Sequence, residues 1–157
     1  MTTHILIEEQ SYKDFYKEVY PLMQSHWDEL GEKGGSTNFA IDHHLMMYLN
    51  STGMYKCFTV KYKGKYIGYS SWVLSNGIHN ATDLYATADA VYIGREYRES
   101  LLGAGIKLLK YSEKVLKEKY KVDIMQFSMN VNYDLSKLLS RMGYEISEVK
   151  YSKKVGE

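Results

Sequence analysis

The sequence predicts an α/β fold in which a mixed β-sheet of about six or seven strands is flanked by about four helices. Segments in which apolar and polar residues alternate, as in strands, stand between segments whose apolar residues recur every three or four positions, as in helices. The 157 residues contain one proline, no internal repeat and no linker rich in Pro, Gly or Ser. We therefore expect residues 1–157 to form a single domain.

The composition excludes several classes of protein. Hydrophobic residues make up 45% and charged residues 25% of the chain, as in globular proteins. No apolar stretch approaches the ~20 residues that cross a membrane, and an acidic pair stands where a signal peptide would be apolar. We therefore expect a cytoplasmic protein without a membrane partner. The single cysteine, Cys57, excludes an internal disulfide and a thiolate-rich zinc site.

The first elements along the chain are a strand and two helices. Residues 4–8 alternate as a short strand, and residues 12–30 carry apolar side chains at helical spacing. Pro21 lies inside this helical pattern and is expected to kink or divide the helix. Residues 41–48 predict a second short helix, with Asp42 as its N-cap.

The middle of the chain is rich in Val, Ile, Tyr and Phe, which favour strands. Residues 55–62 and 66–74 predict a β-hairpin, because Gly64 lies in the short connection between them. Residues 86–93 predict a further strand. Its alternation places Asp89 on the same face as Val91 and Ile93.

The last third returns to the helical period. Residues 104–120 have an apolar face opposite a row of lysines, which predicts a helix that lies on the sheet. Residues 122–129 predict a strand and residues 134–142 a short helix that Gly143 ends. Residues 144–155 predict one or two closing strands.

One loop carries a chemical signal. The strand at residues 86–93 leads to Arg98 and then to Gly103, Ala104 and Gly105, where the long helix begins. The first turn of a helix has free backbone N–H groups and a positive dipole end, which together bind a pyrophosphate well. Glycine allows the backbone to approach the phosphates closely, although a loop glycine also serves plain turns.

The strand, the Glu-Tyr-Arg sequence that ends at Arg98, the Gly-Ala-Gly loop and the following Lys-Leu-Leu resemble the acetyl-coenzyme A motif of the GCN5-related N-acetyltransferases (GNAT). The predicted order of elements is also similar to theirs. A strict count from Arg98 puts Leu101 where the family has its first glycine, whereas a count back from the helix selects Gly103 and Gly105. The resemblance implies that acetyl-coenzyme A binds at Arg98, Gly103, Ala104 and Gly105.

The resemblance extends to the pantetheine arm and to the last third of the chain. It implies that the backbone of Val91, Tyr92 and Ile93 holds the arm like an added strand. Asn132, followed by a short helix and Gly143-Tyr144, is similar to a family segment that completes the cofactor site. Where many members carry a tyrosine that protonates the thiolate, this chain has Leu139. Tyr133 is the nearest candidate for that acid, and packing beside a strand end is its alternative role. A narrower series of residues resembles phage-borne members.

The family mechanism implies direct attack of an amine on the thioester, so that Cys57 is expected to be a buried structural thiol. Asp89 is the candidate general base if partial burial raises its pKa; a structural role is the alternative. His26 and Glu29 share a helix face, and with His79 they are the candidates for acceptor binding. The adjacent His43 and His44 point apart on a helix, so no metal site is expected.

These observations favour an N-acetyltransferase that uses acetyl-coenzyme A as co-substrate, without a metal, and acts on a primary amine of a small molecule or protein. The alternative is a catalytically weakened module that holds coenzyme A or a host or partner protein. The net charge of +1 argues against a nucleic-acid partner. The oligomeric state, including a homodimer, is left open.

Overall fold

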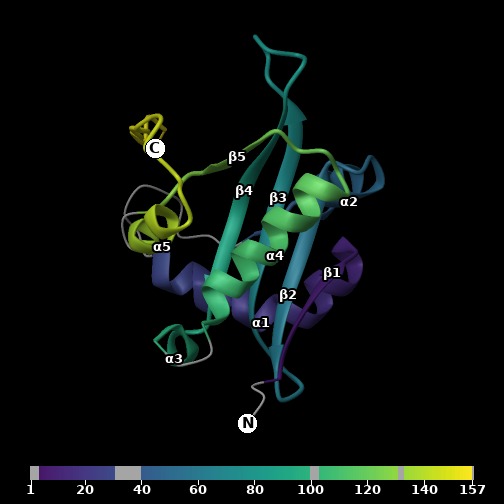
Figure 1. The fold of residues 1–157 in the computed structure, drawn as a ribbon, viewed down its shortest axis with the longest axis vertical. Coiled ribbons are helices and arrows are strands. Elements are labelled where there is room, and N and C mark those ends of the chain that lie inside the picture. Colours follow the sequence, from purple (N-terminus) through teal and green to yellow (C-terminus); the bar gives the residue numbers. More distant parts are fainter. Residues whose placement is uncertain (1–3, 31–39, 100–102, 131–132, 157) are drawn as a thin grey trace.

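The structure is a computed structural model, and it describes residues 4–30, 40–99, 103–130 and 133–156. A five-stranded sheet is surrounded by helices (Figure 1). The strands are β1 (Ile5–Gln10), β2 (Tyr55–Tyr62), β3 (Lys65–Asn76), β4 (Leu84–Ile93) and β5 (Ile124–Phe127). The helices are α1 (Tyr12–Leu30), α2 (His43–Ser51), α3 (Arg95–Arg98), α4 (Ala104–Glu118) and α5 (Ser136–Arg141).

The strands lie in the sheet in the order in which they follow one another in the chain. The first four are antiparallel neighbours, whereas β5 pairs with β4 in parallel after the crossover through α4. A tight turn joins β2 to β3, and both Lys63 and Gly64 have a positive φ there, as two-residue hairpin turns require. The mixed sheet expected from the sequence is therefore confirmed.

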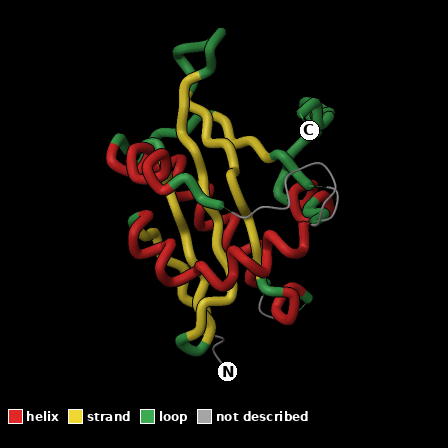
Figure 2. Tube along the Cα trace, turned by 180° about the vertical axis from the view of Figure 1, so that it is seen from behind, coloured by secondary structure: helices red, strands yellow, loops and turns green. Residues whose placement is uncertain are grey.

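The helices form one layer on each face of the sheet. Leu108, Leu109 and Leu116 of α4 are fully buried against one face, where they join a core that includes Phe58 and Trp72. On the other face, α1 packs through a separate core (Figures 1 and 2). This second core is unusually aromatic, and its buried members include Tyr12, Phe15, Val19, Tyr55, Cys57, Tyr69 and Tyr92.

A buried chain of hydrogen bonds joins α4 to the sheet. The indole N–H of Trp72 donates to Ser70 Oγ at 3.1 Å, and Ser70 lies 2.9 Å from Ser112 Oγ. Ser112 donates to the backbone carbonyl of Leu108 at 2.8 Å. Each hydroxyl therefore has both a donor and an acceptor partner, which buried polar groups need.

Two sequence-based expectations about α1 and the strand count are corrected. α1 runs undivided through Pro21. Proline has no N–H to donate to the backbone carbonyl of Lys17, but both residues lie on the exposed side of the helix, where water can donate to that carbonyl instead. The sheet has five described strands rather than six or seven. A short helix, α3, was not expected.

The expected closing strands at residues 144–155 are also absent, since the described residues 144–156 form no strand. Ile146 and Tyr151 are more than 90% exposed, so these apolar residues of the segment do not pack against a sheet. β5 is shorter than expected and has no strand on its outer edge within the described ranges. None of the described helices is both long and apolar enough to cross a membrane.

Candidate functional site

The pairing of β4 with β5 covers only part of β4. The parallel pairing joins Tyr85 through Ala88 of β4 to Ile124 through Phe127, and it goes no further. The last residues of β4 therefore present backbone on that side without a strand partner in the described part of the chain. α4 begins close to this end of β4 (Figure 1).

A β-bulge in β4 decides where Asp89 lies. Ser71 of β3 pairs with Ala90 and Trp72 pairs with Ala88, so Asp89 is the extra residue between them. Ala88 packs in the core on the α4 side, whereas Ala90 packs in the core on the α1 side. The contacts of Asp89 are also with residues on the α1 side. The expectation that Asp89 shares a face with Val91 and Ile93 is therefore wrong, because the extra residue interrupts the alternation.

The carboxylate of Asp89 is held by two hydroxyl groups. Ser71 Oγ donates to Oδ2 at 3.2 Å and Tyr55 Oη donates to the same oxygen at 3.4 Å. Burial of the carboxylate against β2 and β3 raises the pKa of Asp89, and the two hydrogen bonds partly oppose that rise. The residue nevertheless keeps an exposed surface. Asp89 therefore combines access from solvent with the raised pKa that a general base needs.

Tyr133 lies against the end of β4. The backbone N–H of Ile93 donates to Tyr133 Oη at 3.2 Å, and the tyrosine is 9% exposed. Burial raises its pKa, against the effect of that hydrogen bond and of the Arg98 charge. The hydroxyl is thus protonated at neutral pH and lies on one of the backbone groups that the family resemblance assigns to the cofactor.

Arg98 and Glu29 form an ion pair between the cofactor loop and α1. Arg98 Nη2 lies 2.7 and 2.6 Å from the two Glu29 carboxylate oxygens, and Tyr92 Oη donates to Glu29 at 2.8 Å. Burial would raise the pKa of Glu29, but these bonds hold it below its usual value. The guanidinium also lies over the ring of Tyr133, 4.6 Å from its centroid, and its Nε donates to the carbonyl of Ile93 at 2.8 Å. These two residues therefore join α1 to the segment that follows β4.

His26 belongs to the same aromatic cluster. Its ring stacks on Tyr92 at 4.7 Å between centroids, and Nδ1 lies 2.9 Å from Tyr69 Oη. Burial lowers the pKa of His26 to about 4, although the charge of Glu29 opposes the shift. His26 is therefore neutral at pH 7 and already engaged in packing.

The start of α4 has the geometry of an anion site. Gly103 adopts a left-handed conformation with a φ of +59°, and no side chain of the described residues caps the helix. Ala104 is 2% exposed, and Gly105 faces Leu138 and Ile93. Lys107 on the first turn is exposed and adds positive charge. Free helix N–H groups beside the end of β4 are what a pyrophosphate requires.

The structure brings most of the predicted site residues together, with two exceptions. Asn132 lies outside the described residues, as does Leu101, where a strict count from Arg98 puts the first glycine of the family motif. His79 lies in the connection between β3 and β4, at the opposite end of the sheet from the start of α4 (Figure 1). Tyr55 and Ser71, which bind the Asp89 carboxylate, were not predicted from the sequence. The one available signal was the alternation of β2, which places Tyr55 on the same strand face as the buried Cys57. Cys57 itself is 1% exposed with a raised pKa caused by burial.

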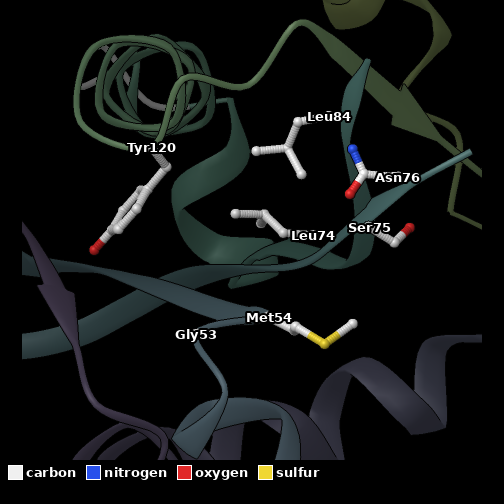
Figure 3. Close-up of a pocket in the computed structure, with 7 residues that line it drawn as sticks. All are labelled: Gly53, Met54, Leu74, Ser75, Asn76, Leu84 and Tyr120. Carbon is white, nitrogen blue, oxygen red and sulfur yellow. The ribbon is translucent and has the colours of Figure 1, made fainter. Parts of the chain in front are cut away.

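Two open cavities lie away from these residues. The larger, about 560 Å³, is at the far end of the sheet from α3, between the start of β4 and the end of α4 (Figure 3). It is lined by Gly53, Met54, Leu74, Ser75, Asn76, Leu84 and Tyr120. The second, about 490 Å³, lies beside α4 and the end of α5. Neither cavity includes a predicted site residue.

Comparison with known proteins identifies the fold. No protein-family model matches the sequence, and no curated protein sequence matches it. An aminoglycoside acetyltransferase from an uncultured soil metagenomic sample is similar in structure, with a TM-score of 0.71, 15% identity and 97% of both chains covered. Ribosomal-protein-alanine N-acetyltransferase from Brucella melitensis biovar Abortus 2308 is similar with a TM-score of 0.72, 15% identity, and 98% of this chain and 100% of that chain covered.

A third similar structure is a predicted acetyltransferase from Clostridium acetobutylicum, solved with acetyl-CoA; the TM-score is 0.67, the identity 11%, and 97% of both chains is covered. At these identities the likeness concerns the fold. The chain therefore has the mixed α/β fold of the GNAT acetyltransferases, as the resemblance of residues 91–109 to their cofactor motif implied.

Proposed function

We propose that residues 1–157 form one N-acetyltransferase domain, which transfers an acetyl group from acetyl-coenzyme A to a primary amine by direct attack in a ternary complex. The observation that carries this proposal is the continuity of three features. The end of β4 has no strand partner on the β5 side, α4 begins close to that end, and Asp89 lies on the same strand as a residue that keeps exposed surface.

The cofactor side rests on backbone groups. The N–H groups of Gly103, Ala104 and Gly105 hold the pyrophosphate. The backbone of Val91, Tyr92 and Ile93, at the end of β4 that has no strand partner on the β5 side, holds the pantetheine arm. The Ile93 N–H polarises the thioester carbonyl, so Tyr133 Oη must first leave that group. Once displaced, the protonated Tyr133 is the candidate that returns a proton to the leaving thiolate. Arg98 supports the site through its pair with Glu29.

Asp89 acts on the amine. A protonated amine cannot attack, and the raised pKa of Asp89 allows the carboxylate to accept the amine proton directly or through a water molecule. Cys57 forms no acyl intermediate, because its thiol is buried and its raised pKa keeps it protonated.

The acceptor is a small molecule or a protein with a primary amine. The similar structures include enzymes described as acting on aminoglycosides and on ribosomal-protein alanine, which are amine acceptors of both kinds. Glu29 is bound to Arg98 and His26 is neutral, so Asp89 is the carboxylate of this cluster that is free to meet a cationic group. A cytoplasmic location and a phage origin remain predictions from the sequence.

One observation favours the second candidate, a module that binds coenzyme A or a partner protein without turnover. Tyr133 occupies the Ile93 N–H that catalysis needs. The two candidates differ in whether acetyl-coenzyme A is consumed when amines are supplied.

Cofactor binding is tested at Gly105. A glutamate there brings bulk and negative charge to the start of α4, so Gly105→Glu should weaken acetyl-coenzyme A binding at least tenfold, or ~1.4 kcal/mol, in calorimetry. Gly105→Ala is the matched control, because an added Cβ meets Leu138 at an ordinary 3.5 Å. Absence of binding by the unmodified protein would refute the proposal.

Turnover is tested at Asp89. Asp89→Asn keeps the shape and removes the base, so we expect amine acetylation to slow by ~10² or more while cofactor affinity stays nearly unchanged. Full activity of this variant at neutral pH would assign the base to another group.

A further inference from the structure

Two hydroxyl groups converge on one oxygen of Asp89 and leave the other free. Ser71 Oγ and Tyr55 Oη both donate to Oδ2, at 3.2 and 3.4 Å. Within the described ranges, Oδ1 has no hydrogen-bond partner, and the residue is exposed. The carboxylate is therefore anchored on one side and open on the other.

Both donors are themselves held in place. Tyr55 is 4% exposed, and its ring packs edge-on against Tyr12 at 5.8 Å between centroids. Ser71 is 1% exposed and pairs with Ala90, the residue beside the bulge. The bulge thus turns Asp89 toward two donors whose positions the sheet and α1 determine.

The donors also have a fixed polarity. Burial raises the pKa of Tyr55 far above neutrality, so its hydroxyl stays protonated and can only donate to an ionised carboxylate. The titratable groups that face Asp89 are Tyr55 and Cys57 from β2 and Tyr69 from β3. Since these groups are neutral at pH 7, the two hydrogen bonds are the interactions that favour the ionised form.

We propose that Tyr55 and Ser71 are positioning residues for Asp89. Their hydroxyl groups bind Oδ2, favour the ionised carboxylate and leave Oδ1 pointing to the acceptor amine. The inference rests on the proposed function of Asp89 as a base. It adds two residues that touch neither cofactor nor acceptor and act through the carboxylate.

The pKa of Asp89 measured without any acceptor tests the positioning. Carbon-13 NMR of labelled aspartate, with the Asp89 resonance identified by its loss in Asp89→Asn, follows the titration directly. Tyr55→Phe and Ser71→Ala should each raise this pKa by roughly half a unit or more, because a donor to the anion is lost. Tyr85→Phe and Ser75→Ala remove hydroxyls elsewhere on β4 and β3 and should leave it unchanged.

Kinetics then separates positioning from the function of Asp89. With an acceptor in hand, the acid limb of the rate profile should move to higher pH in Tyr55→Phe and Ser71→Ala by the shift seen in NMR, with the KM for acetyl-coenzyme A unchanged. An unchanged pKa of Asp89 in both folded variants would overturn the positioning role. A shifted pKa together with full activity of Asp89→Asn would uphold the positioning and overturn the proposed base.

Discussion

Gly68 is expected to be the most demanding glycine in the molecule, and Gly68→Ala tests why. The residue lies in β3 opposite Ile93, where the two strands approach closely. An added Cβ would lie 2.6 Å from the carbonyl oxygen of Tyr92 and 2.5 Å from Cδ1 of Ile93. The first contact is with backbone, which cannot rotate away, and Ile93 is itself 4% exposed.

The cost follows from the distance. The contact with Tyr92 is about 0.8 Å shorter than the 3.4 Å at which ordinary van der Waals contact begins, so β4 must move at its cofactor end. Overpacking of this kind costs about 1–3 kcal/mol in the free energy of unfolding. For a domain of this size the midpoint of thermal unfolding should fall by roughly 2–4 °C per kcal/mol. Because the displaced residues are those proposed to hold the pantetheine arm, acetyl-coenzyme A should bind at least about tenfold more weakly.

Urea and thermal unfolding measure the first effect and calorimetry the second. Gly94→Ala is the matched control, because its Cβ would meet the carbonyl of Ile67 at 3.4 Å and its φ is −52. We expect Gly94→Ala to stay within ~0.5 kcal/mol of the unmodified protein. Equal stability and equal affinity of the two variants would refute the close approach of β3 and β4.

Two further predictions concern buried polar groups. Ser70→Ala leaves the indole N–H of Trp72 without its acceptor, so the free energy of unfolding measured in urea should fall by ~1–3 kcal/mol. The control Ser75→Ala, at an exposed serine, should change it little. Equal losses in the two variants would contradict the buried chain of hydrogen bonds. His26 has a pKa of about 4 in the folded protein, against an ordinary value of 6.5. Between these two values the unfolded chain binds more protons than the folded one. The free energy of unfolding should therefore fall, by up to about 3 kcal/mol, as the pH drops from 6.5 to 4. His26→Gln should flatten that slope in urea unfolding at pH 4 to 6.5, and an unchanged slope would show that His26 is not buried as a neutral ring.

The order of the elements followed from the sequence because it depends on local patterns. Hydrophobic period, turn glycines and helix caps act between residues a few positions apart, so the strands through residue 93 and the helix that starts at Ala104 were predicted closely. The same locality explains the failure at residues 144–155. Alternation shows that a segment can form a strand, but a strand also needs an edge to pair with, and that edge is a tertiary property.

Parts of the site were also readable from the sequence. Gly103 and Gly105 at the start of a helix predict a phosphate-binding loop, and Asp89 could be named as a candidate from its place on the strand before it. The partners of these residues could not be named. Glu29 is 69 positions from Arg98, and nothing in the local pattern of either residue indicates the other.

The tertiary structure alone decided which way Asp89 faces. One extra residue in β4 reverses the alternation on which any strand prediction depends, and only the pairing of β4 with β3 reveals it. The same pairing brings Ser71 and Tyr55 to the carboxylate, and the end of the β5 pairing leaves Ile93 free to bond Tyr133. The sequence by itself determined most of the elements and predicted the cofactor loop at residues 103–105, since both rest on neighbouring residues. The orientation and hydrogen-bond partners of Asp89 were decided by strand register and packing, because these depend on contacts between distant parts of the chain.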